Sequence, residues 1–369
     1  MVAGEAAAPA TVIAGSASDR AAGSSAECPI CLEGHPELLP RGCACRGSAG
    51  VAHVDCLVKL AQHHALGAEP DSDSLWWKCG TCLLAFGGQM NLALSKTRWD
   101  LAQKNRGSGP RALGERMTAA ANYAVSLNSD LQHSKAAGMQ REVLETETNL
   151  FGPNHPTTLL TKYGLALSLK ELGRHVEAEV MLSDVLRRRK RTIGPTHNHT
   201  LETANTLASA RRLCGDIPGA LALFRETIAA GRDAHGLNHI ATLVTTTNFA
   251  NLLSYASEDR LGRLESAVLI HDTLRRQTQV LGASHKDTML TAAGVAIHAA
   301  RTFRWHSGQL SEGCAVVIKG LVSRADLNGV FGIVSGKETS TGRWPVAVSD
   351  HSAIFWELAL KPETLTVLA

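Results

Sequence analysis

Apolar residues recur every three or four positions through the middle of the chain, which is the spacing of one face of an α-helix. The stretch 158–172 shows this clearly, with one stripe at Leu159, Tyr163, Ala166, Leu169 and Leu172. Gly173 follows and predicts the end of this helix. A second stripe begins at Val176 and continues to Leu186. The pattern therefore predicts a unit of two amphipathic helices.

These helix pairs recur with a fixed period. A Gly-x-x-His turn occurs at 152–155, 194–197 and 236–239, in steps of 42 residues, and again at 282–285 after a step of 46. Ala166, Ala208 and Ala250 keep the same phase inside the units. One helix pair cannot bury its apolar face alone, whereas stacked neighbours can. The period predicts helical repeats over residues 110–306, with four full units and a partial fifth from residue 282.

The 42-residue unit, its Gly-x-x-His turn and the run Glu177-Ala178-Glu179 resemble the kinesin-light-chain type of tetratricopeptide repeat. Armadillo and HEAT units have similar lengths and remain the alternative. The resemblance implies an α-helical superhelix whose groove takes a protein substrate or peptide. Candidate groove residues, whose side-chain amides could hold a peptide backbone, are Asn122, Asn205 and Asn248. The alternative for these asparagines is an ordinary solvated polar face.

Seven of the nine cysteines lie between residues 28 and 82, in close pairs. The pairs are Cys28 with Cys31, Cys43 with Cys45, and Cys79 with Cys82, and a fourth pair joins His53 to Cys56. Eight such ligands are what two closed tetrahedral zinc sites need. They can be divided into two sites in three ways, and their spacing does not choose among them. The alternative is free or disulfide-bonded cysteine.

The run C-x2-C-x11-C-x-C-x7-H-x2-C-x22-C-x2-C, within residues 27–86, resembles the RING-CH (RING-variant) zinc finger of ubiquitin ligases. The resemblance implies a cross-brace of two Zn2+ ions per chain. One ion would be held by Cys28, Cys31, His53 and Cys56, and the other by Cys43, Cys45, Cys79 and Cys82. A plant-homeodomain finger is the competing interpretation, because it has the same ligand order and an aromatic residue where Trp77 stands. Its ligands are spaced differently between Cys43 and His53.

The same resemblance implies a function. A RING-type finger has no catalytic nucleophile and instead docks a ubiquitin-conjugating enzyme, here through Ile30, Trp76, Trp77 and Leu83. The repeats would then recruit a protein substrate. Leu60 and Gly80 depart from residues common in RING fingers at these positions. The alternative function is a non-enzymatic, zinc-binding protein-protein interaction adaptor.

The remaining segments differ in character. Residues 1–26 are rich in Ala, Gly and Ser and predict a disordered lead-in. Residues 87–109 are expected to form a linker helix. From about residue 312 to 369, short β-branched runs predict strands. This part resembles a small SH3-like β-barrel through its Leu327-Asn328-Gly329 and Gly342-Arg343-Trp344 motifs. The fold class expected is multidomain and mostly α, with a zinc finger at one end and a small barrel at the other.

Net charge and composition limit the kinds of partner and the location that we expect for this protein. A net charge of +3 over 369 residues is too small to indicate binding to nucleic acid or to a membrane surface. No apolar stretch reaches the roughly 18 residues that span a bilayer. Zinc binding needs reduced thiolates, which favours a cytoplasmic or nuclear protein. Neither a G-x-S-x-G nor an H-E-x-x-H motif is present.

Overall fold

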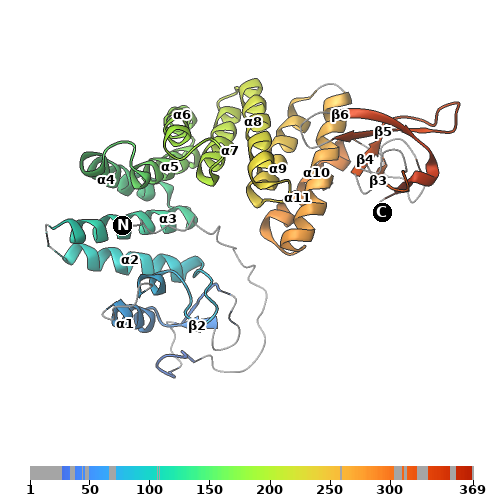
Figure 1. The fold of residues 1–369 in the computed structure, drawn as a ribbon. Helices are drawn as coiled ribbons and strands as arrows, with labels where there is room; N and C mark the ends of the chain where they lie inside the picture. The colour runs from blue at the N-terminus through green and yellow to red at the C-terminus, as the bar shows by residue number, and fades with distance from the viewer. Residues whose placement is uncertain are drawn as a thin grey trace. The chain divides into compact units, whose positions relative to one another are not determined.

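The computed structural model describes residues 27–33, 38–43, 45, 50–65, 72–105, 107, 109–257, 260–302, 310, 314–321, 331–349 and 355–367. The expected lead-in at 1–26 lies outside these residues. The chain divides into two units, one ending at Arg174 and the other beginning at His175. The described residues contain eleven α-helices and seven short strands, so the protein is mostly α (Figure 1).

The first unit begins with the cysteine-rich module. Strands β1 (Leu39–Pro40) and β2 (Val51–Ala52) pair antiparallel, and α1 (Val54–Ala65) follows β2 directly. The short 3-10 helix η2 (Ser72–Trp76) packs against α1. The buried core of this module comprises Cys28, Ala52, Leu57, Val58, Ala61, Trp76, Cys79, Phe86, Met90 and Leu94. The core is small, so the module depends on something besides hydrophobic burial for its stability.

Four longer helices complete the first unit: α2 (Gly88–Lys104), α3 (Pro110–Ser129), α4 (His133–Phe151) and α5 (Pro156–Glu171). Each packs against the next along the chain. In the range 87–109, where a linker helix was expected, the structure has α2. Its Met90 and Leu94 are completely buried in the core of the cysteine-rich module, and α2 also packs against α3.

The second unit continues with six helices: α6 (His175–Thr192), α7 (Asn198–Leu213), α8 (Ile217–His235), α9 (Ile240–Ala256), α10 (Arg260–Leu281) and α11 (Lys286–Thr302). Each contacts the next, and α7 also contacts α9. Ala208 and Ala250 are completely buried, as small residues are where helix backbones approach closely.

The Gly-x-x-His turns end one helix and begin the next. Gly194 and Gly236 have φ of +94° and +86°, a conformation that glycine adopts without strain. In three of the four turns the histidine caps the following helix, and Nδ1 of His197 accepts a hydrogen bond from the backbone N–H of His199 at 3.2 Å. The exception is His239, whose side chain makes no such hydrogen bond. The stripes are less complete than the pattern predicts, because Leu172 and Val176 lie at helix ends and are 41% and 67% exposed.

The C-terminal part is a five-stranded antiparallel sheet with the order β6-β5-β4-β3-β7. Its strands are β3 (Ala315–Ile318), β4 (Phe331–Val334), β5 (Trp344–Ser349), β6 (Phe355–Leu360) and β7 (Leu365–Val367), with the 3-10 helix η4 (Pro362–Thr364) before β7. Val334 and Val346 lie in the sheet's own core.

One face of this sheet packs against the repeats. Successive side chains of a strand point to opposite faces, and Ile333 and Ala347 alternate with the core residues of β4 and β5. They form one buried cluster with Leu264 and Val268 of α10. Strands β4 and β5 lie beside α10 (Figure 1). The sheet is therefore joined to α10 by a hydrophobic contact. Among the described residues, no helix is long and apolar enough to cross a membrane.

Candidate metal centre

The first group of ligands forms where a tight turn meets the start of α1. Cys28 and Cys31 lie in a turn closed by a hydrogen bond from Leu32 N–H to the Cys28 carbonyl, at 2.8 Å. His53 directly precedes α1, and Cys56 lies in its first turn. The Nδ1 atom of His53 is 3.3 Å from Sγ of Cys31 and 3.8 Å from Sγ of Cys56. The imidazole therefore presents Nδ1 to the sulfurs.

The second group joins the segment after β1 to a second turn. Cys43 and Cys45 come from that segment, and Cys79 and Cys82 from a turn of the same design as the first. There, Leu83 N–H donates to the Cys79 carbonyl at 2.9 Å. The leucine after each turn has a positive φ, +63° for Leu32 and +58° for Leu83. The two C-x-x-C turns thus have matching conformations.

Both groups have the spacing of a tetrahedral metal site. The four candidate ligand atoms of each group all lie within 4.8 Å of one another. Four sulfurs about 2.3 Å from a tetrahedral zinc ion would be about 3.8 Å apart, and Sγ of Cys45 is 3.7 Å from Sγ of Cys79. A disulfide would need about 2.05 Å, and none of the nine cysteines forms one. Two cysteine and histidine clusters could therefore hold metal ions, in the interleaved grouping that the resemblance implies.

The backbone prepares one thiol of each group to lose its proton. Burial acts to raise the pKa of Cys28, but backbone N–H groups, that of His53 first, outweigh it and bring the pKa to about 6. In the same way, burial opposes and backbone N–H groups of Cys82 and Thr81 favour the Cys79 thiolate, whose pKa is about 6. Burial raises the pKa of Cys45 to about 12, and neighbouring thiols add to this effect. Negative charges on neighbouring sulfurs repel one another, and a bound divalent cation would instead favour the thiolate form of each.

A close backbone contact holds the second group in place. Gly42 has φ of +67°, and a Cβ there would lie 2.7 Å from the Cα of Gly87. The backbone N–H of Gly87 donates to the Arg41 carbonyl at 2.9 Å. Since Gly87 directly precedes α2, this contact fixes the segment of Cys43 and Cys45 against the start of that helix.

The four predicted docking residues separate into two kinds. Ile30 and Leu83 are 39% and 72% exposed. Trp76, in contrast, is only 7% exposed and belongs to the module core, so its ring offers a partner little surface. Trp77 is half-buried, and the guanidinium of Arg98 lies 5.1 Å from its ring centre.

Two further exposed apolar side chains were not predicted. Leu32 and Leu84 are 74% and 53% exposed. Leu32 directly follows the first C-x-x-C turn and has a positive φ, and Leu84 lies two residues after the second turn, next to Leu83. Their place after the second cysteine of each turn is the sequence signal that could have identified them, since so tight a turn has no room to cover them.

Two of the predicted groove asparagines contact each other. The side-chain amide of Asn248 on α9 donates to Oδ1 of Asn205 on α7 at 3.0 Å, and both side chains are half-buried. Asn122 lies on α3 of the other unit. Asn205 and Asn248 therefore form a pair on neighbouring helices of the second unit.

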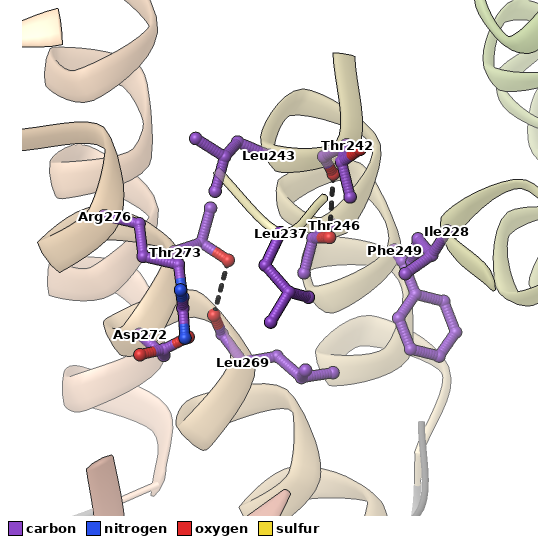
Figure 2. Close-up of a pocket in the computed structure, with 10 residues that line it drawn as sticks. All are labelled: Ile228, Leu237, Thr242, Leu243, Thr246, Phe249, Leu269, Asp272, Thr273 and Arg276. Atoms are coloured by element: carbon purple, nitrogen blue, oxygen red, sulfur yellow. Dashed lines mark hydrogen bonds and ion pairs between the residues drawn. The ribbon is translucent and has the colours of Figure 1, made fainter. Parts of the chain in front are cut away.

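A small cavity lies between α8, α9 and α10 (Figure 2). Its volume is about 20 Å³, and its lining includes Leu237, Thr246 and Leu269. Asp272 and Arg276 form an ion pair at its edge, with a nitrogen to oxygen distance of 2.6 Å. This volume is enough for about one water molecule, so the cavity is too small for an organic ligand.

Comparison with known families identifies the repeats. The family model described as "Tetratricopeptide repeat" matches residues 158–230. This segment consists of tetratricopeptide repeats. The match covers about a fifth of the chain, from α5 into α8. Tetratricopeptide repeats are a protein-protein interaction scaffold, so a protein partner is expected for this part. A search of curated proteins finds no match.

Solved structures show distant likenesses. A variant of a Podosopora anserina protein described as a kinesin light chain with nearly identical TPR-like repeats shares 17% identity, covering 61% of this chain and 97% of its own, with a TM-score of 0.45. BtubC (BKLC) from P. vanneervenii shares 14%, covering 57% of this chain and 82% of its own, with a TM-score of 0.46. At these values, the assignment of the repeats rests on the family model and the helix pairs alone.

Proposed function

We propose that this protein binds two zinc ions in its cysteine-rich module and a protein or peptide partner on its repeats. The observation that supports the metal sites is the gathering of eight ligand atoms into two groups with tetrahedral spacing. Zinc suits ligand sets of four cysteines, or of three cysteines and one histidine, in structural sites. Such closed sets leave no position for a substrate, so the ions would stabilise the fold. The expected location remains cytoplasmic or nuclear.

The repeats are proposed to be of the kinesin-light-chain type along the whole of 110–306. The 42-residue period and the capped Gly-x-x-His turns support this finer assignment. A partner peptide would lie across the first helices of successive pairs. The Asn205 and Asn248 side chains, already in contact with each other, are the amides we propose to hold its backbone. The C-terminal sheet is proposed to be SH3-like, with its last strand beside its first.

A second, more specific candidate is a RING-CH-type ubiquitin ligase, in which the module docks a ubiquitin-conjugating enzyme. The observation that favours it is the exposure of Ile30 and Leu83 beside the two C-x-x-C turns. Exposed apolar side chains in a group mark interaction sites more often than scattered ones. Such a ligase acts by proximity and orientation, because a RING-type finger has structural metal sites and no catalytic nucleophile. The buried Trp76 leaves this candidate with a smaller surface than expected.

Metal analysis of the purified full chain tests the first proposal. We expect two zinc ions per chain, since structural zinc contributes on the order of 10–16 kcal/mol per site in small fingers. A chelator should unfold the cysteine-rich module and leave the repeats helical by circular dichroism. One ion, or none, would contradict the two-site proposal. Cys43→Ser should lose one ion.

Ubiquitin discharge tests the second candidate. The full chain would be incubated with activating enzyme, ATP, ubiquitin and a panel of conjugating enzymes. Ile30→Ala should retain both metal ions and slow discharge, whereas Leu150→Ala, which truncates a side chain on α4 that is 49% exposed, should have no effect. If the unaltered chain discharges no conjugating enzyme in the panel, the ligase candidate is wrong and the non-enzymatic adaptor remains.

A further inference from the structure

One charged side chain is buried beside the four-cysteine group. Arg41 follows β1 and is 6% exposed. Its Nη1 atom donates to Sγ of Cys79 at 3.8 Å, and Cys79 is completely buried. Its backbone is held on both sides, since Arg41 N–H donates to the Gly50 carbonyl at 2.8 Å and Gly87 N–H donates to the Arg41 carbonyl at 2.9 Å. The side chain is thereby aimed at the sulfurs.

In the part of the chain that the structure describes, this guanidinium pairs with no carboxylate. Among the described residues, no ion pair of Arg41 is found, and its Nε is buried without a hydrogen-bond partner. Removing a cation from water is unfavourable unless an anion compensates its charge. If only packing were needed, an uncharged side chain of similar length would serve without that cost. The sulfurs of the four-cysteine group are the anions available to it.

The two metal sites would differ in charge. A divalent ion bound by four thiolates carries a net charge of −2, whereas one bound by three thiolates and a neutral imidazole carries −1. The more negative complex needs more compensation in a low-dielectric core. The four-cysteine group, rather than the group that contains His53, is the one that Arg41 contacts.

We propose that Arg41 is the charge partner of the four-cysteine metal site and strengthens its hold on a divalent ion. The inference rests on the proposed zinc binding. It assigns to Arg41 a positioning role, exerted through the sulfur of Cys79. Partners outside the ligand set typically change metal affinity 10–100-fold when they are removed. The effect should be confined to one of the two sites, which makes the other an internal control.

The full chain loaded with Co2+ provides the test. Cobalt bound by four thiolates and cobalt bound by three thiolates and an imidazole absorb at different wavelengths, so a chelator titration follows both sites in one sample. Arg41→Gln should weaken the four-cysteine site about 10–100-fold and leave the other site unchanged. Arg41→Lys, which keeps the charge, should recover part of the loss. Lys78→Gln is the matched control, because Lys78 is a cationic residue that directly precedes Cys79 in the sequence.

The outcomes separate the two proposals. If the unaltered chain binds no metal, the proposed zinc sites are wrong and the inference fails with them. If it binds two ions and Arg41→Gln weakens neither site, or both equally, only the role of Arg41 is wrong. Equal losses in Arg41→Gln and Lys78→Gln would also overturn it, because any nearby charge would then suffice. Should Arg41→Gln fail to fold, Arg41→Lys decides. Complete loss of Co2+ binding at its four-cysteine site would contradict the proposal, because this variant keeps the positive charge.

Discussion

A second buried arginine, in the repeats, allows a quantitative prediction. Arg189 lies on α6 and is 3% exposed. Its Nη1 donates to the His199 carbonyl at 2.9 Å and to Oγ1 of Thr203 at 2.7 Å, both on α7. These bonds join the second helix of one repeat to the first helix of the next. Arg189→Met keeps the length of the side chain and removes both bonds.

The magnitude follows from the burial of these bonds. Hydrogen bonds from a charged donor contribute about 1.5–3 kcal/mol each. Part of this is offset, because the methionine no longer has to be desolvated as an ion. We expect a net loss of about 2–4 kcal/mol. The control is Arg187→Met, two positions earlier on the same helix. Arg187 is 57% exposed and pairs with Asp184, and exposed pairs contribute about 0.2–1 kcal/mol.

Thermal unfolding of the full chain, followed by helical circular dichroism, measures both variants. In a unit of this size, 1 kcal/mol corresponds to about 2–4 °C in Tm. Arg189→Met should therefore lower the Tm of the repeats by roughly 5–15 °C, and Arg187→Met by less than about 4 °C. Equal shifts in the two variants would refute the reasoning, because they would show that burial of the guanidinium bonds does not decide their contribution.

Other positions give sharper or simpler outcomes. Gly42→Ala should lower the Tm of the metal-loaded chain, because the new Cβ would lie 2.7 Å from the Cα of Gly87; an unchanged Tm would contradict this. Burial raises the pKa of Glu147, so its contribution to stability is complete below the unfolded pKa and is lost as pH rises through the folded one. The change in Tm that Glu147→Gln causes, relative to the unaltered chain, should therefore be more positive at pH 8 than at pH 4. Equal changes in Tm at both pH values would refute this. Ala166→Leu and Ala208→Leu should each cost about 1–3 kcal/mol in urea unfolding, and silent changes would place these alanines away from the helix contacts.

The sequence determined the features that depend on residues close together along the chain. Tight C-x-x-C turns are local, so the ligand pairs at Cys28 and Cys79 could be recognised from spacing alone. The helix pairs follow from a 3.6-residue periodicity, and the glycines at 194 and 236 mark their ends because only glycine adopts positive φ without strain. The β-strand runs after residue 312 were likewise visible in the pattern of β-branched residues.

The tertiary structure decided which distant segments meet. The grouping of Cys43 with Cys79 joins residues far apart in the sequence, and spacing left three groupings open. Burial of a charged residue cannot be recognised from the sequence pattern either, because arginine is usually a surface residue. Arg41 and Arg189 are buried where other segments supply hydrogen-bond acceptors, the Cys79 sulfur for Arg41 and the His199 carbonyl for Arg189. Trp76, which the sequence offered as a docking residue, lies in the module core, and η2, which carries it, packs against α1. Local propensity fixes turns and helices, whereas charge compensation and burial depend on packing between segments that the sequence pattern does not specify.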